Sequence, residues 1–343
     1  MDSALETGFA TGLEGDLPLS PESLPPPHIE HLQNALVMPM EKGPDCACGV
    51  VRADGSFRHM SRTLLSGSRL SGVPQFSPDV FAEIVPGRWL FAGIGRHHFG
   101  HFLVETLIRL WAIGYYRDKL DGIVIAPKFG MDFSLALERR YAPFLDLMTE
   151  GLKVHLAEHP TRYETLLLPS PGFGPLGWVA GTEIFRLEIR ARVARHIAPK
   201  GPEKLYISRA DLSKHEKRVH DEKKIEALLE RAGYEIFHPE KFSIAEQLER
   251  YMAARVVIGG DGSAFHLAPF AMPEGVKVGL IQRRHRPKVY TAFLAQLDAF
   301  TKAEVHQIKP VLPKTEETPH PSEAATPIDV EVVEAELDAA GFL

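Results

Sequence analysis

The stretch from residue 204 to residue 281 constrains the fold most, because short apolar runs alternate in it with helical patterns. The apolar runs read as buried strands, and the segments between them place apolar residues on one helix face. These runs begin at Lys204, Tyr234, Arg255 and Gly275. Strands that alternate with helices pair in parallel through right-handed crossovers, so the stretch predicts a parallel α/β sheet. In such sheets ligands bind beyond the carboxyl ends of the strands.

Two polar segments come directly after strands of this predicted sheet, and we expect them to meet in space. Ser208-Arg209 follows the first strand, and the Gly-rich turn Gly259–His266 follows the third. The glycines let a ligand approach the backbone, and a helix that starts after the turn would direct N–H groups at an anion. The alternative is a tight turn without a ligand. The candidate phosphate-binding residues are Ser208, Arg209, Gly260, Asp261, Gly262, Ser263 and His266.

A polar stripe marks a second region. His97, His101, Glu105 and Arg109 recur every fourth residue, which predicts one face of a helix that begins near His97. The other faces are apolar, so the stripe needs partners, water or a ligand. It is either a self-satisfied network or a catalytic face, on which Glu105 or His101 accepts a hydroxyl proton. His97 and His101 also have the spacing of metal ligands, but no His-Glu-x-x-His pattern is present, so we predict no metal site.

These two regions together resemble glycosyltransferase family 61, which includes bacterial capsule-type enzymes and plant and animal transferases of xylose or N-acetylglucosamine. The resemblance covers residues 80 to 285. The segments that carry it are Phe99–Leu110, Ile207–Arg209, Asp221-Glu222, Ser243–Gln247 and the Gly-rich turn. One departure stands in that turn. The family turn usually reads Gly-x-His-Gly-Ala, and Asp261 replaces its histidine here.

The resemblance implies an α/β fold of the GT-B type, with two Rossmann-like domains facing across a cleft. It implies an inverting hexosyl- or pentosyltransferase that moves a sugar from a nucleotide-sugar donor to a hydroxyl of a glycan, such as a capsular or other cell-surface polysaccharide. Glu105, His101 and Arg109 are then the expected catalytic residues, and Arg209 with the turn amides is expected to meet the charge of the leaving diphosphate. No cofactor is then obligatory, and a divalent metal is left open.

Two other classes of function compete with a transferase. The first is a catalytically inactive glycan- or nucleotide-binding protein with the same fold, which the replacement at Asp261 favours. The second is a dinucleotide-dependent oxidoreductase. It is disfavoured, because no G-x-G-x-x-G follows a strand with an acidic residue about 20 positions further on.

Composition shifts predict the domain boundaries. Residues 1–30 read as a Pro-rich acidic arm, 45–180 as the acceptor domain, 181–310 as the nucleotide domain and 311–343 as an acidic Pro/Glu-rich tail. We expect residues 1 to about 30 and residues 315–343 to be dispensable for folding. The Pro- and Gly-rich break at 169–178 is either a simple connection or a cleft loop. As a cleft loop it would offer Phe173 and Trp178 to a sugar, with His97 on the same acceptor side.

Charge and cysteine usage limit the partners. The net charge of −6 gives no general attraction to nucleic acid. The two cysteines, Cys46 and Cys48, are expected to be free thiols. We predict no signal peptide and no transmembrane helix, and so a cytoplasmic protein with at most peripheral contact to the inner face of the membrane. The basic loop 282–288 assists phosphate binding or is simply solvated, and a homodimer is left open.

Overall fold

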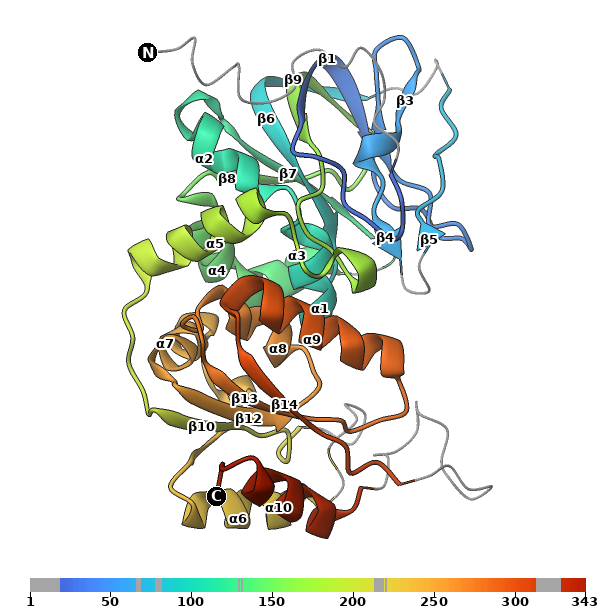
Figure 1. Ribbon diagram of the computed structural model, residues 1–343. Coiled ribbons are helices and arrows are strands. Elements are labelled where there is room, and N and C mark those ends of the chain that lie inside the picture. The colour runs from blue at the N-terminus through green and yellow to red at the C-terminus, as the bar shows by residue number, and fades with distance from the viewer. Residues whose placement is uncertain are drawn as a thin grey trace. The chain divides into compact units, whose positions relative to one another are not determined.

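The computed structural model describes residues 19–65, 69–77, 82–128, 130, 132–212, 219, 221–312 and 328–343. The chain divides into two compact units, Met1–Arg192 (unit 1) and Val193–Leu343 (unit 2) (Figure 1). Each unit contains its own sheet with helices packed against it, so the predicted α/β class is confirmed.

Unit 1 is built on a seven-stranded mixed sheet in the order β3-β2-β1-β9-β6-β7-β8. Its strands are β1 (Ile29–Met38), β2 (Gly49–Val51), β3 (Phe57–Arg58), β6 (Glu83–Gly95), β7 (Gly122–Pro127), β8 (Lys153–Leu156) and β9 (Thr161–Pro169). Strands β9, β6, β7 and β8 run parallel to one another. Strands β1, β2 and β3 add an antiparallel half, so this sheet is less Rossmann-like than the resemblance implied. A separate two-stranded ribbon pairs β4 (Leu64–Leu65) with β5 (Arg69–Leu70).

The helices of unit 1 are short and mixed in type. They are η1 (His59–Ser61), α1 (Phe99–His101), η2 (Phe102–Thr106), η3 (Leu110–Ala112), α2 (Ile113–Tyr116), η4 (Arg117–Lys119), α3 (Phe133–Ala136), η5 (Leu137–Tyr141), α4 (Ala142–Thr149) and η6 (Leu176–Trp178). Both η2 and η5 are π-helices, whereas η1, η3, η4 and η6 are 3₁₀ turns. The longer α5 (Glu183–His196) begins in unit 1 and ends in unit 2, and it buries Phe185, Ile189 and Val193, as their spacing indicates.

Unit 2 has a five-stranded, fully parallel sheet in the order β11-β10-β12-β13-β14. Its strands are β10 (Lys204–Ile207), β11 (Glu235–Phe237), β12 (Val256–Gly260), β13 (Lys277–Ile281) and β14 (Glu304–Ile308). Its helical segments are α6 (Glu222–Arg231), η8 (Pro239–Lys241), α7 (Ile244–Ala253), α8 (Ala264–Leu267), η9 (Ala268–Phe270), α9 (Pro287–Thr301) and α10 (Val330–Ala339). Helices α6 and α10 cover one face of the sheet, and α7, α8 and α9 cover the other (Figure 1). This doubly wound order reverses direction between β10 and β12, which is where such sheets bind ligands.

The amino-terminal boundary differs from the prediction. Strand β1 lies in the middle of the unit 1 sheet, between β2 and β9, although it precedes the predicted domain start at residue 45. Residues before it also dock, since the indole Nε1 of Trp178 donates a hydrogen bond of 2.8 Å to the carbonyl of Ser20. The first residues of the predicted arm, 1–18, lie outside the described residues.

The carboxyl-terminal boundary is also different. Val333 and Leu337 of α10 are fully buried against the unit 2 sheet, and Phe342 is 2% exposed. Tyr234 donates a hydrogen bond of 3.0 Å to the carbonyl of Phe342, and Lys277 donates one of 2.6 Å to the carbonyl of Ala340. The prediction that this segment stays outside the core is therefore wrong for residues 328–343. The apolar pair Val333 and Leu337, at i and i+4, packs α10 onto the unit 2 sheet as part of its core.

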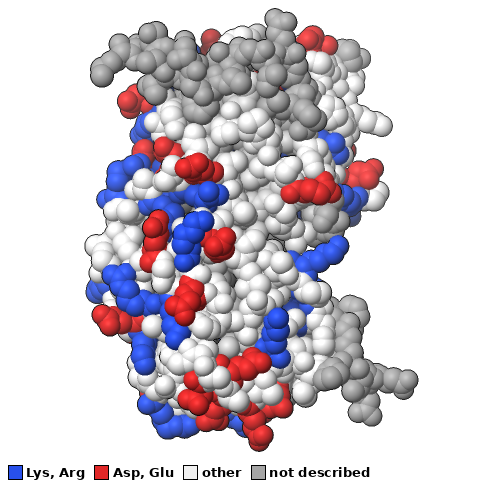
Figure 2. Space-filling model, viewed as in Figure 1, with Lys and Arg blue, Asp and Glu red and all other residues white. Residues whose placement is uncertain are grey.

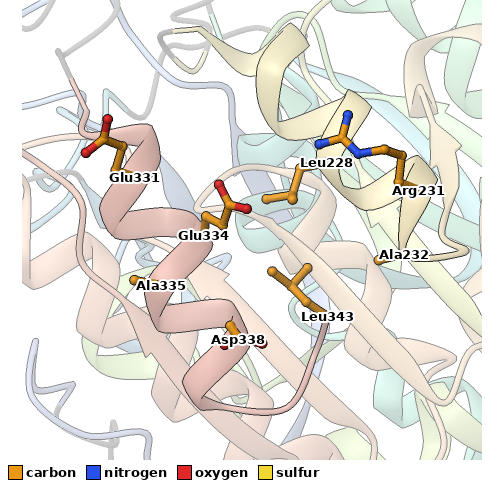
Figure 3. A pocket seen from close by; sticks show the side chains of 8 residues that line it. All are labelled: Leu228, Arg231, Ala232, Glu331, Glu334, Ala335, Asp338 and Leu343. Atoms are coloured by element: carbon orange, nitrogen blue, oxygen red, sulfur yellow. The ribbon is translucent and has the colours of Figure 1, made fainter.

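Helices α6 and α10 leave a shallow groove of about 630 Å³ between them (Figure 3). Its floor is apolar, with Leu228 and Leu343, and its α10 wall carries Glu331, Glu334 and Asp338. Acidic side chains gather over this part of unit 2 (Figure 2). Among the described residues, no helix has the length and the apolar character that crossing a membrane requires.

Candidate functional site

The carboxyl edge of the unit 2 sheet brings together the two segments that the sequence singled out. Strands β10 and β12 are neighbours with Ile207 opposite Gly259, so Arg209 and the Gly-rich turn leave the sheet side by side. A Cβ atom added to Gly262 would lie 2.8 Å from Nη1 of Arg209. The predicted meeting of Arg209 with the turn is confirmed, and the Arg209 guanidinium lies directly against Gly262.

Buried carboxylates fix the backbone that carries Arg209. Oε1 of Glu222, at the start of α6, accepts a hydrogen bond of 2.8 Å from the amide of Arg209 and one of 3.0 Å from the hydroxyl of Tyr206. Burial raises the pKa of Glu222 above its ordinary value. The Ser208 hydroxyl donates to Glu226 and accepts from the amide of Ala210 at 3.1 Å. Its hydrogen bonds therefore shape the strand end, and Ser208 is 1% exposed.

Two further arginines, which the sequence did not single out individually, reach the same turn from the end of β13. Arg283 is 4% exposed, and its Cδ atom lies 3.3 Å from the position of a Cβ added to Gly260. The pKa of Arg283 is lowered to about 9, first by burial and then by the like charges of Arg209 and Arg284. The signal was available in the basic loop 282–288, which follows a strand as Arg209 does.

Asp261 is part of the Gly-rich turn and is fully buried. Its Oδ1 accepts a hydrogen bond of 3.1 Å from the amide of Arg283, and its Oδ2 accepts one of 2.9 Å from Nε of Arg284. Its own amide donates to the carbonyl of Ile281 at 3.0 Å. Both carboxylate oxygens and the amide of Asp261 therefore have hydrogen-bond partners within the protein. This setting does not favour the predicted contact of Asp261 with a ligand.

The segment after the turn is a shorter helix than a strong dipole needs. Helix α8 spans only Ala264–Leu267 and passes into the 3₁₀ turn η9, so the amides of Gly262 and Ser263, rather than a macrodipole, are what the turn offers. His266 points toward α9, where its Nδ1 lies 2.8 Å from Oε1 of Gln296 and its ring packs on Phe293. These contacts with α9 make His266 a residue that anchors the turn.

In unit 1 the structure brings His101 and Glu105 together. Nδ1 of His101 donates a short hydrogen bond to Oε1 of Glu105, and Nε of Arg96 lies 3.5 Å from Oε2. The side chain of His101 is 39% exposed, whereas that of Glu105 is 2% exposed. A carboxylate accepts hydrogen bonds, so this contact assigns the proton to Nδ1 and leaves the lone pair on Nε2. Arg96 is a site residue that the fourfold spacing did not include.

Irregular backbone positions this dyad. His101 ends α1, and Glu105 lies in the π-helix η2. The π-helix is rare in proteins overall, but the examples that occur are frequently found at functional sites. Strand β6 has a bulge between Phe91 and Gly93, and a Cβ at Gly93 would lie 2.3 Å from the carbonyl oxygen of Glu105. Phe102 of η2 stacks on Tyr141 of η5 with ring centroids 4.0 Å apart. Strand, bulge and aromatic stack together fix the π-helix.

The predicted stripe is broken at both ends. The π-helix ends at Thr106, and Leu107 and Arg109 both have ψ near 0°, which turns Arg109 away from Glu105. Arg109 is fully buried and donates to the carbonyls of Pro169 and Met60, each at 2.9 Å. Burial lowers the pKa of Arg109 to about 9. The single helix face expected from His97 to Arg109 is therefore wrong, and Arg109 has the setting of a structural anchor.

The two aromatic residues predicted for the acceptor side are inside the protein. Phe173 and Trp178 are both fully buried, and Phe173 stacks on Phe185 with centroids 4.8 Å apart. The break at 169–178 packs onto unit 1 because its aromatic residues are large and apolar, so the expectation that they face a sugar is wrong. His97 lies before α1 with its side chain exposed, and its carbonyl accepts a hydrogen bond of 2.6 Å from Tyr141.

One group of the described residues has metal-ligand spacing: Asp211, His238 and Glu240 offer atoms within 4.8 Å of one another. Asp211 is already paired with Lys241 and with Lys223, at 3.3 Å from the latter. These two lysines lower the pKa of Asp211 to about 2. The group is therefore accounted for by surface ion pairs. Cys46 and Cys48 are free thiols, as expected.

Comparison with known proteins gives one family. The family model described as Glycosyltransferase 61 matches residues 99–279, which span both the dyad of unit 1 and the Arg209 edge of unit 2. No curated protein sequence matches the chain.

Proposed function

The chain belongs to the glycosyltransferase 61 family, and we propose that it is an inverting enzyme that transfers a sugar from a nucleotide-sugar to a hydroxyl of a glycan. The observation that carries this proposal is the buried Glu105 carboxylate behind a partly exposed His101. A buried carboxylate that orients an imidazole is the usual arrangement of a general base.

The donor half of the proposal rests on the carboxyl edge of the unit 2 sheet. Arg209 and the glycines at 260 and 262 lie at the point where the strand order reverses. Guanidinium groups match phosphate oxygens in geometry as well as in charge. We propose that the diphosphate of the nucleotide-sugar binds here, and that Arg209 stabilises the negative charge that develops on it as the sugar departs.

The acceptor half rests on His101. In the proposed step Nε2 takes the proton of the acceptor hydroxyl, the acceptor oxygen forms a bond to the anomeric carbon, and the bond from that carbon to the diphosphate oxygen breaks. Glu105 then stabilises the imidazolium and holds its tautomer. A single displacement inverts the anomeric centre. We further propose that units 1 and 2 act as the acceptor and donor halves of a GT-B enzyme.

His101 suits the role of base better than Glu105 does. The Glu105 carboxylate lies between His101 and Arg96 and is almost inaccessible, so a hydroxyl has no approach to it in this arrangement. The His101 ring has the exposure that an acceptor needs.

A non-catalytic binding protein with the same fold is the second candidate, and one observation bears on it. Asp261 has a structural role of its own in the turn, because its carboxylate is buried and accepts hydrogen bonds from Arg283 and Arg284. We therefore favour an active enzyme.

A two-step experiment tests this proposal. Thermal-shift screening of the whole chain against UDP, GDP and CMP should identify one nucleotide that raises the melting temperature. Incubation with the matching nucleotide-sugars should then release that nucleotide, faster when an oligosaccharide acceptor is present. Binding without any release would favour the non-catalytic candidate, and the absence of any shift would contradict the donor site.

A further inference from the structure

The turn of unit 2 is approached by guanidinium groups from two strand ends, one on each side. Strand β12 carries the turn and lies between β10 and β13 in the sheet. Arg209, after β10, lies against Gly262, and Arg283, after β13, lies against Gly260. The two arginines therefore flank the same short backbone segment, at glycines two positions apart.

A buried carboxylate joins the β13 side of this arrangement. Asp261 accepts from the Arg283 amide at 3.1 Å and from Nε of Arg284 at 2.9 Å, and its carbonyl oxygen accepts from Nε of Arg283. Both arginine side chains are mostly covered, at 4% and 15% exposure. Through these hydrogen bonds, Asp261 holds the two consecutive arginines against the turn.

Positive charge is concentrated at this strand edge. The charges of Arg209 and Arg284 lower the pKa of Arg283, and those of Asp261 and Glu222 raise it. Two other guanidinium groups therefore lie near enough to Arg283 to act on it, and clustered guanidinium groups match phosphate oxygens in geometry and in charge.

We propose that Arg283 and Arg284 form a second arm of the phosphate site, opposite Arg209, and that Asp261 is the positioning residue that holds this arm. The inference rests on the proposed donor site and adds to it the residues that hold the second phosphate group. Arms on both sides of one turn fit two linked phosphates, so the ligand class is a diphosphate rather than a single phosphate.

Calorimetry with inorganic pyrophosphate and with inorganic phosphate on the whole chain tests this arm. The variant Arg284→Ala should weaken pyrophosphate about 10- to 100-fold, the size of a lost charge-assisted hydrogen bond. Arg286→Ala is the matched control, because Arg286 lies in the same loop with an exposed side chain. Wild-type protein should bind pyrophosphate more tightly than phosphate, and Arg284→Ala should reduce that preference.

Arg283 needs a gentler change, since its removal would leave Asp261 buried with one partner fewer. Arg283→Lys keeps the charge and loses the planar fork, so it should fold and bind pyrophosphate several-fold more weakly than wild type. Melting temperatures of the ligand-free variants identify any that fail to fold.

The role of Asp261 is tested through its partner. Asp261→Asn should weaken pyrophosphate in the wild-type background, because Arg284 loses its anchor. In the Arg284→Ala background the same change should cause no further loss, because Asp261 then has no arm to hold. Equal losses in both backgrounds, or tighter binding in the wild-type background, would overturn the positioning role.

The outcomes separate this inference from the proposed function. Pyrophosphate binding that depends on Arg209 but is equally insensitive to Arg284→Ala and Arg286→Ala overturns the second arm and leaves the donor site standing. Equal weakening by Arg284→Ala and Arg286→Ala shows only a general effect of charge and also overturns the arm. Failure of pyrophosphate and of every nucleotide to bind the wild-type chain overturns the donor site itself.

Discussion

The two candidate sites start from the same kind of place and are built differently. Both follow the carboxyl end of a parallel strand, β6 in unit 1 and β10, β12 and β13 in unit 2. In unit 2 the residues come from three strand ends and are held by ion pairs and glycines. In unit 1 they come from one continuous segment, Arg96 to Glu105, and are held by a bulge and a π-helix. A regular sheet brings together residues that are far apart in the sequence, whereas irregular backbone orients residues that are close in the sequence.

This difference has a consequence for how the two sites fail. The unit 2 site depends on the sheet and its covering helices, so a lesion far from the turn removes it. The unit 1 site depends on a few close backbone contacts, so a single added methyl group displaces it. The following predictions test each half of the comparison.

The largest expected effect comes from deleting residues 328–343. The deletion removes four buried apolar side chains, those of Ile328, Val333, Leu337 and Phe342. Each contributes about 2–5 kcal/mol, and whole domains are stable by only about 5–15 kcal/mol. Unit 2 should therefore unfold, with loss of nucleotide binding and of protection against proteolysis. A chain that lacks residues 1–18 is the control, and equal melting of both truncated chains would contradict the packing of α10.

The second effect concerns nucleotide affinity. Arg209→Ala should weaken the preferred nucleoside diphosphate by about 1.5–3 kcal/mol, the value of a charge-assisted hydrogen bond. Arg255→Ala is the matched control, because Arg255 is exposed next to the amino end of β12, at the opposite edge of the same sheet. Calorimetry measures both. Unchanged affinity in Arg209→Ala would remove the donor from this edge.

The smallest effect on stability, and the most local, is expected at Gly93. A Cβ there would lie 2.3 Å from the Glu105 carbonyl, so Gly93→Ala should cost about 1–3 kcal/mol as the π-helix shifts. Turnover should fall while nucleotide affinity is kept, because unit 2 is untouched. Gly43→Ala serves as control, since a Cβ at Gly43 would meet no atom within 4 Å. Chemical denaturation and steady-state kinetics give the two readouts.

How far the sequence alone could go differs between the sites for the same physical reason. The alternation of strands and helices predicted that Arg209 would meet the turn, because parallel topology fixes which strand ends are neighbours. The fourfold spacing assumed a continuous α-helix, and it gave the His101–Glu105 contact but misplaced Arg109 beyond the end of the π-helix. No pattern in the sequence predicts this π-helix, because it depends on tertiary contacts such as the stacking of Phe102 on Tyr141.

Burial was the other limit. The Pro- and Gly-rich break looked like an exposed loop, yet Phe173 and Trp178 turn inward, since a large aromatic side chain gains more from the core than a loop loses by packing. Asp261 looked like a ligand-facing residue because its neighbours are glycines. Its carboxylate instead accepts hydrogen bonds from Arg283 and Arg284, which follow the next strand, β13.

The most direct test of the whole account is Glu105→Gln, measured for turnover, nucleotide affinity and melting temperature together. The amide keeps the shape and an acceptor for His101 but loses the charge that stabilises an imidazolium. Glu138→Gln is the matched control, since Glu138 is exposed in the other π-helix of unit 1. We expect Glu105→Gln to keep its melting temperature and nucleotide affinity and to lose at least ~10²-fold in turnover. Turnover that survives while the melting temperature falls would make the dyad a structural ion pair and contradict the account.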